Sequence, residues 1–266
     1  MPFDIAGTTL DSRFFLGTAG YPSPHVLRQA IAAAEADVVT VGLKRQLAQG
    51  TGKPVPNAAG QGFLDIIRQS GAHLLPNTAG CYTADEAITL AQMAREVFDT
   101  HWIKLEVIGD SYTLQPDPVE LVRAATELVK LGFEVFPYCT DDLVTCQRLL
   151  DAGCRILMPW GAPIGSGQGL VNPYALRTLR ERITDVPLVI DAGIGSPKDA
   201  AQAMEMGFDA VLLNSAVSNA HDPALMAEAF KLAIQAGHKA REAGIIAKQD
   251  LAVPTTPVTG RPFILA

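Results

Sequence analysis

The stretch His101-Trp-Ile-Lys-Leu-Glu-Val-Ile-Gly-Asp110 decides the fold. As a strand it turns Lys104 and Glu106 to one face and only apolar side chains to the other, because successive side chains alternate. An edge strand with both charges in water would give the same pattern. However, the flanking runs are almost wholly apolar and alternate between strand and helix, which favours a sheet covered by helices. The apolar face then meets the helices, so we expect Lys104 and Glu106 to point into the interior that the sheet encloses.

The pattern around this stretch recurs along the chain, with apolar strand-like segments between segments of helical spacing. We predict strands at residues 13–17, 37–42, 73–76, 101–108, 134–138, 155–159, 187–191 and 210–214. About eight such units predict a single-domain (β/α)8 TIM barrel over residues 1–250. A doubly wound open sheet is the alternative, but Gly17-Thr-Ala-Gly20 lacks the G-x-G-x-x-G spacing typical of that fold.

The starts and stops of the helices are marked by capping residues. Helix starts combine a capping side chain with a proline at the first helical position, and one start resembles a capping box. These are Ser23-Pro24, Asp117-Pro118, Asn172-Pro173, Ser196-Pro197, Asp222-Pro223 and Thr83-Ala-Asp-Glu86. Glycines that favour a left-handed conformation end the helices directly before strands, at Gly71, Gly132, Gly153 and Gly207.

The two ends of the chain fall outside the repeating unit. Residues 3–10 read as a short hairpin around Ala6-Gly7, which we expect to plug the bottom of the barrel. Residues 251–266 contain three prolines and a glycine, so they predict an extended tail and not a long helix. The sequence leaves open whether this tail covers the mouth of the site or a neighbouring subunit.

Composition excludes several classes of protein. The 266 residues are 48% hydrophobic and carry a formal net charge of −7. This negative charge and the lack of a cluster of Lys or Arg argue against a nucleic-acid-binding protein. No apolar run is long enough to span a membrane, and residues 1–7 do not resemble a signal peptide, so we expect a cytoplasmic protein. The cysteines lack the spacing of a metal or disulfide site and are interpreted as core residues: Cys81, Cys139, Cys146 and Cys154.

Several loops that follow the predicted strands are unusual, and in a barrel that is where chemistry occurs. Residues 44–57 are rich in Gly and Pro and read equally as a mobile lid or a surface loop. Residues 160–170 contain four glycines, which favour close approach of backbone to a ligand over a purely structural loop. A glycine turn opens a helix at residues 191–197, and Asn214-Ser-Ala216 follows the eighth strand; together they predict a phosphate site with free backbone N–H groups.

These motifs resemble those of the thiazole synthase family over nearly the whole chain. The resemblance is carried by the runs Gly17-Thr-Ala-Gly-Tyr21, Leu75-Pro-Asn-Thr-Ala-Gly-Cys81, Trp102-Ile-Lys-Leu-Glu106, Pro137-Tyr-Cys139, Gly161-Ala-Pro-Ile-Gly-Ser-Gly167, Asp191-Ala-Gly-Ile-Gly195 and Asp209-Ala-Val-Leu-Leu-Asn214. The central glycine run and the D-A-G-I-G run at this spacing are highly specific together. Trp160 stands where the family more often has an aliphatic residue.

The resemblance implies a reaction that builds the thiazole phosphate of thiamine without a cofactor or metal. The family condenses 1-deoxy-D-xylulose 5-phosphate, dehydroglycine and sulfur carried as a thiocarboxylate on a small ubiquitin-like carrier protein. It implies that Lys104 forms an imine with the sugar ketone and that Glu106 and Asp191 are acid–base groups. The sugar phosphate is then expected at Gly161, Ala192, Gly193, Asn214 and Ser215. We also expect a homo-oligomer, of a size that the sequence leaves open.

One tension and two rival functions remain. Burial would lower the pKa of Lys104 toward the neutral amine that imine formation needs, whereas Glu106 favours the ammonium. An inert buried ion pair is the structural alternative, although such pairs stabilise poorly. A Schiff-base aldolase acting on a phosphosugar would share the lysine and the phosphate corner but need no protein partner. A phosphosugar-binding regulator would bind without forming a covalent adduct.

Overall fold

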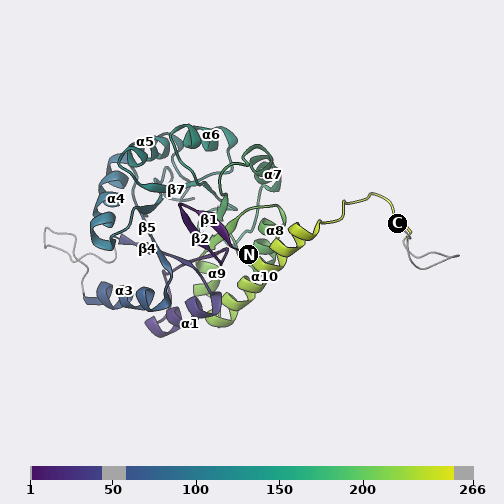
Figure 1. The fold of residues 1–266 in the computed structure, drawn as a ribbon, viewed down its shortest axis with the longest axis horizontal. Coiled ribbons are helices and arrows are strands. Elements are labelled where there is room, and N and C mark those ends of the chain that lie inside the picture. The colour runs from purple at the N-terminus through teal and green to yellow at the C-terminus, as the bar shows by residue number, and fades with distance from the viewer. Residues whose placement is uncertain (1, 44–57, 255–266) are drawn as a thin grey trace.

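The computed structural model describes residues 2–43 and 58–254, and within them eight parallel strands form a barrel surrounded by helices (Figure 1). The strands run in the spatial order β8-β7-β6-β5-β4-β3-β10-β9. Their bounds are β3 Phe14–Gly17, β4 Val38–Gly42, β5 His73–Asn77, β6 Trp102–Leu105, β7 Glu134–Cys139, β8 Met158–Pro159, β9 Val189–Asp191 and β10 Ala210–Leu213. Single parallel bridges from Leu157 to Leu188 and from Trp160 to Asp191 join the two ends of this order. The predicted (β/α)8 barrel is therefore confirmed.

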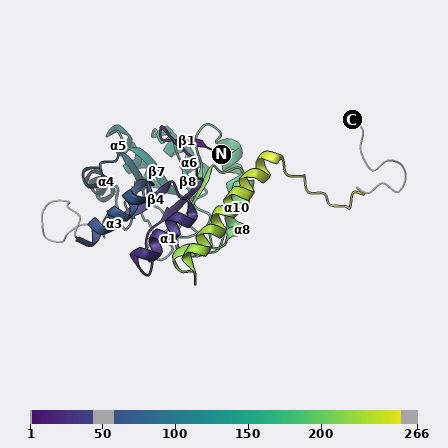
Figure 2. The ribbon, with the colours of Figure 1, turned by 60° about the horizontal axis from the view of Figure 1, so that its bottom comes forward.

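Helices follow the strands and bury their apolar faces against the outside of the barrel (Figure 2). Their bounds are α1 Pro24–Ala34, α3 Ala58–Ser70, α4 Ala84–Phe98, α5 Pro118–Lys130, α6 Leu143–Asp151, α7 Pro173–Arg182, α8 Pro197–Glu205, α9 Ser215–Ser218 and α10 Pro223–Ala243. The four-residue helix α9 was not predicted, because it is too short to leave a periodic pattern. None of the helices in the described residues combines the length and apolar composition that a membrane crossing requires.

Most of the predicted capping side chains bond the start of their helix. At α8, however, the Asp199 carboxylate accepts from the Ser196 N–H. At α4 the Glu86 carboxylate accepts from the Tyr82 N–H, so the predicted capping box there is half formed. Ser23, Asp117, Asn172 and Asp222 each accept a hydrogen bond from a backbone N–H in the first turn of the helix that follows. Thr83 does the same at α4. The four predicted stops all adopt a left-handed conformation with positive φ: Gly71, Gly132, Gly153 and Gly207.

The N-terminal hairpin closes the bottom of the barrel. Strands β1 (Phe3–Ile5) and β2 (Thr8–Leu10) pair antiparallel around Ala6 and Gly7, which both have positive φ. Ile5 and Leu10 are only 1% exposed and pack in an apolar cluster with side chains from the barrel strands. This cluster fills the lower half of the barrel, so a polar cavity can exist only above it.

All eight strands differ from their predicted bounds by one to three residues, and β8 begins at Met158 where residue 155 was predicted. The ladder of β6 ends at Leu105, whereas a strand to Ile108 was predicted. The polypeptide leaves the barrel at Gly244, and residues 244–254 are exposed and contain no helix or strand (Figure 1). The predicted boundary at residue 250 thus lies within this exposed segment, and most of the predicted tail (residues 255–266) lies outside the described residues.

Candidate active site

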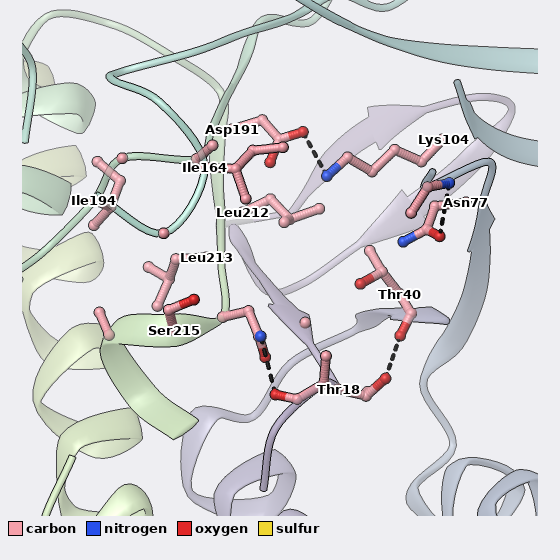
Figure 3. Close-up of a pocket in the computed structure, with 18 of the residues that line it drawn as sticks. Thr18, Thr40, Asn77, Lys104, Ile164, Asp191, Ile194, Leu212, Leu213 and Ser215 are labelled. Atoms are coloured by element: carbon pink, nitrogen blue, oxygen red, sulfur yellow. Dashed lines mark hydrogen bonds and ion pairs between the residues drawn. The ribbon is translucent and has the colours of Figure 1, made fainter. Parts of the chain in front are cut away.

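A buried lysine lies between two carboxylates inside the barrel. Lys104 and Glu106 are each 6% exposed, and Asp191, the last residue of β9, is 1% exposed. The Lys104 Nζ atom lies 2.7 Å from Asp191 Oδ2 and 3.4 Å from Glu106 Oε1. Figure 3 shows the lysine reaching across the cavity to Asp191. The side chains therefore point inward, which excludes the reading of a strand edge with both charges in water.

Thr78 fixes the backbone that carries this pair. Its hydroxyl donates to the carbonyl oxygen of Glu106 at 2.7 Å and accepts from the Glu106 N–H at 2.8 Å. The Thr78 N–H also donates to the carbonyl of Lys104 at 3.1 Å. The Thr78 side chain, just after β5, thus supplies the hydrogen bonds that a neighbouring strand would otherwise make to the backbone of Glu106. Glu106 keeps its inward direction even though it lies beyond the regular strand.

We expect Thr78→Val to lower the free energy of unfolding by about 1–3 kcal/mol, because valine leaves the Glu106 N–H and carbonyl unpaired in a buried place. Urea denaturation measures the change. Thr89→Val is the matched control, because the Thr89 hydroxyl bonds a backbone carbonyl on the exposed surface of α4. Its expected effect is within about 0.5 kcal/mol. Equal losses in both variants would contradict the role assigned to Thr78.

The charges of the site act on one another. Burial alone would lower the pKa of Lys104, but Asp191 and Glu106 outweigh it together, so that pKa is raised. Burial raises the pKa of Asp191 to about 6, although Lys104 draws it down. The pair is an ammonium and a carboxylate at neutral pH. The raised pKa of Asp191 makes it a better base toward the ammonium than an ordinary aspartate would be.

Tyr138 completes the wall of the site below the lysine. Its side chain is fully buried, and its ring centre lies 5.7 Å from Lys104 Nζ, where a cation is attracted to the ring face. Burial, with the negative charges of Asp191 and Glu106, raises the pKa of its hydroxyl. Tyr138 therefore stays neutral.

A cavity of about 620 Å³ lies at the carboxyl ends of the strands. It is lined by Lys104, Glu106 and Asp191, which we call the triad. Besides the triad, most of the residues expected to hold the sugar phosphate line it: Ala192, Gly193, Asn214 and Ser215. The cavity also reaches polar residues that the sequence analysis did not single out, namely Thr18, Thr40, Asn77 and Asn219. Thr18 follows β3, Thr40 and Asn77 belong to β4 and β5, and Asn219 lies just beyond α9. Polar side chains within otherwise apolar strands, as at Thr40 and Asn77, were the one signal that could have drawn attention to any of them.

Free backbone N–H groups line one corner of the cavity. Within the described residues, the N–H groups of Gly193, Ile194, Ser215 and Ala216 have no hydrogen-bond partner in the protein. This corner lies after strands β9 and β10, as the sequence predicted. Such groups favour an anion, so the corner suits a phosphate.

The donors are not the ones expected at the start of α8. The N–H groups of Gly195 and Ser196 both donate to the carboxylate of Asp199, which lies in the first turn of that helix. The helix start is thus already neutralised by its own side chain. Of the N–H groups predicted to be free within residues 191–197, those of Gly195 and Ser196 are therefore taken, and those of Gly193 and Ile194, directly before them, are free among the described residues.

Gly161 lies outside the cavity lining, unlike the other expected phosphate ligands. Its N–H donates to the carbonyl of Ala192 at 3.2 Å, and the Gly169 N–H donates to the carbonyl of Gly193 at 2.8 Å. A Cβ atom on Gly193 would lie 2.3 Å from the Ala162 nitrogen. These glycines therefore hold two loops against each other. Gly161 supports the corner and does not contribute a free donor to it.

The cysteines and the acidic groups do not gather into a metal site. All four cysteines are buried and free, as expected of core residues. In the part of the chain that the structure describes, no cluster of three or more His, Cys, Asp or Glu side chains is placed to hold an ion.

Comparison with known proteins gives close relatives. Residues 4–257 match the family model of the thiazole biosynthesis protein ThiG. The thiazole synthase of Gluconacetobacter diazotrophicus is 60% identical over 97% of this chain and 98% of its own length. The thiazole synthase of Coxiella burnetii is 57% identical over 98% of both.

Solved structures agree in fold. The crystal structure of the Amycolatopsis orientalis BexX/CysO complex contains a chain that is 31% identical, with a TM-score of 0.80 over 93% of this chain and 98% of that one. The 3-hexulose-6-phosphate synthase of Salmonella typhimurium is 20% identical, with a TM-score of 0.57 over 85% of this chain and all of that one, and shows the shared barrel alone.

Proposed function

The chain belongs to the thiazole synthase family of thiamine biosynthesis, and on that premise we propose how its barrel builds the ring. The proposed substrates are 1-deoxy-D-xylulose 5-phosphate, dehydroglycine and a thiocarboxylate on a small carrier protein. The observation that carries the proposal is the buried ammonium of Lys104 between two carboxylates, facing a cavity with an anion corner. A buried ion pair contributes little to the stability of a fold, so the presence of one in this cavity favours a chemical role.

The first step is imine formation on Lys104. The Nζ atom must lose a proton before it attacks the sugar ketone, and Asp191 at 2.7 Å is placed to take it. A C=N bond then replaces the C=O bond and water leaves; one of its hydrogens comes from Nζ and the other from protonated Asp191, so the product is the protonated imine. This resolves the tension over the lysine pKa: the amine need not be neutral at rest, because its base is in contact with it.

Glu106 serves the proton transfers that follow. Its carboxylate lies on the same side of the barrel as the lysine, at 3.4 Å from Nζ, so it remains beside the protonated imine. Removal of a proton from the carbon next to the imine gives an enamine, and a carboxylate near that carbon is suited to the step. The phosphate is proposed to bind the free N–H groups of Gly193 and Ser215, with Asn214 beside them.

The rate of imine trapping should depend on pH in a specific way. Transfer from Lys104 to Asp191 changes no net protonation, so the rate should be flat from about pH 7 to 9. Below the Asp191 pKa of about 6, the carboxylate holds a proton and cannot accept another, so the rate should fall by about tenfold per pH unit. Stopped reactions with cyanoborohydride and mass detection measure it. A rate that rises steadily through pH 7 to 9 would mean that solvent removes the lysine proton instead.

A protein partner fits the way sulfur must arrive. We propose that the carrier's C-terminal tail enters the open mouth of the cavity, since the thiocarboxylate has to reach a substrate fixed on Lys104. The likeness to a chain crystallised with the protein CysO supports a protein partner. The loop of residues 44–57, interpreted from the sequence as a mobile lid or a surface loop, lies outside the described residues. Assembly into a homo-oligomer stays a prediction.

Reconstitution tests the proposed function. The chain is mixed with deoxyxylulose phosphate, thiocarboxylated carrier, and glyoxylate with ammonia, which form dehydroglycine in solution. We expect the thiazole phosphate by mass spectrometry. With the sugar phosphate alone we expect no carbon–carbon cleavage, whereas a Schiff-base aldolase would release fragments. A phosphosugar-binding regulator would give neither product nor covalent adduct.

A further inference from the structure

The cavity has room and polar groups for a second small molecule. A five-carbon sugar phosphate has about 13 non-hydrogen atoms, and at the roughly 30 Å³ of a liquid water for each it fills about 390 Å³. The cavity of about 620 Å³ is larger. Figure 3 shows the anion corner at Ser215 and Ile194 on one side, and Thr40 and Asn77 on the other. When the phosphate binds in the anion corner and the sugar is joined to Lys104, the part of the cavity beside Thr40 and Asn77 stays free.

Asn77 presents donors to this side. It is the register partner of Lys104 across β5 and β6, so the two side chains stand next to each other on the inner face of the barrel. Its Oδ1 atom accepts a hydrogen bond from the N–H of Ala79 at 3.3 Å. That bond fixes the amide with its Nδ2 donors toward the cavity, where they meet no acceptor among the described residues.

Thr40 adds a second group beside it. The residue is 6% exposed and lines the cavity from the middle of β4. Its backbone carbonyl is held by the hydroxyl of Thr18, which fixes the end of the strand. Its own hydroxyl has no hydrogen-bond partner in the part of the chain that the structure describes. Nearly buried polar groups without a partner are costly unless a ligand or water completes them.

We propose that Thr40 and Asn77 form the subsite for the carboxylate of the glycine-derived imine. This rests on the proposed function, which requires that imine to meet the carbons of a sugar held on Lys104. A carboxylate is the one charged group on so small a molecule, and it suits a pair of neutral donors next to the Lys104 side chain. The two anionic groups then lie on opposite sides of the lysine, so the phosphate and the carboxylate do not compete.

Oxamate is a stable planar analogue of the imine and serves as the probe. Calorimetry measures its binding to the protein saturated with deoxyxylulose phosphate. We expect Asn77→Ala and Thr40→Val each to weaken oxamate about tenfold, the effect of a lost hydrogen bond to a charged group. Thr89→Val is the matched control: Thr89 lies on the exposed surface of α4, so the binding of both the sugar phosphate and oxamate should be unchanged. Should Asn77→Ala fail to fold, Thr40→Val decides alone, because it keeps the shape of the side chain.

The outcomes separate this inference from the function it rests on. Trapping of the sugar on Lys104 should persist in Asn77→Ala, and its absence in the unmodified protein would instead sink the proposed function. No oxamate binding to the unmodified protein, or equal binding to all variants, would overturn the subsite. Glycylglycine that binds more tightly than oxamate, with the same dependence on Asn77, would assign the subsite to the carrier's tail and would likewise overturn it.

Discussion

Replacing Lys104 by methionine is expected to abolish both the trapped sugar adduct and thiazole formation. Methionine keeps most of the apolar stem but has no amine to attack the ketone, so the covalent route is closed. The assay is mass spectrometry after borohydride reduction, together with the reconstituted synthesis. Lys130→Met is the control, since Lys130 lies on the exposed face of α5 and, among the described residues, pairs only with Glu127. A full adduct on the Lys104→Met protein would show that another amine carries the substrate.

The same variant should be less stable, in a manner that depends on pH. Without Lys104, the carboxylates of Glu106 and Asp191 are buried without a cation, and breaking a buried pair costs about 3–5 kcal/mol. A carboxyl whose folded pKa is raised gains stability as pH falls through that pKa, because the folded state then binds the proton more tightly than the unfolded one. The loss should therefore be largest near pH 7 and shrink toward pH 5. Urea unfolding at both values measures it.

Asp191→Asn is expected to separate imine formation from synthesis. Asparagine keeps the shape of the side chain but cannot accept a proton, and a lost acid–base group lowers the rate by about 10²- to 10⁴-fold. Thiazole formation should fall by that much. The sugar should still be trapped on Lys104 after long incubation near pH 9, where hydroxide replaces Asp191 as the base.

The matched control for that variant is Asp185→Asn, which changes an exposed aspartate in the loop before β9. Its synthesis rate should equal that of the unmodified protein. Synthesis at an unchanged rate in Asp191→Asn would remove Asp191 from the mechanism. Loss of trapping at every pH would mean that Asp191 holds the lysine in place and does little else.

The sequence predicted the barrel and the inward lysine because both depend on local patterns. Alternation placed Lys104 and Glu106 on the inner face, and the capping side chains marked most helix starts. What it missed depends on contacts between distant segments. Nothing near Glu106 shows that Thr78 would take over its backbone, and nothing near Gly195 shows that the carboxylate of Asp199 would turn back to neutralise the helix start.

The glycines show the same limit. Gly161 was predicted to let a ligand approach the backbone, but the group that approaches its backbone is the carbonyl of Ala192. Thr40 and Asn77 went unnoticed because a single threonine or asparagine in a strand is common, and only the closed barrel brings them to the cavity that Lys104 faces. A glycine can accommodate either a ligand or another loop, and the fold decides which.

Peptide mapping of the reduced adduct tests the central claim most directly. The unmodified protein is incubated with deoxyxylulose phosphate, reduced with borohydride, digested and sequenced by tandem mass spectrometry. The account predicts the mass of the reduced sugar phosphate on the peptide that contains Lys104, and on no other lysine. An adduct on a different lysine, or no adduct from a preparation that makes the thiazole phosphate, would contradict it.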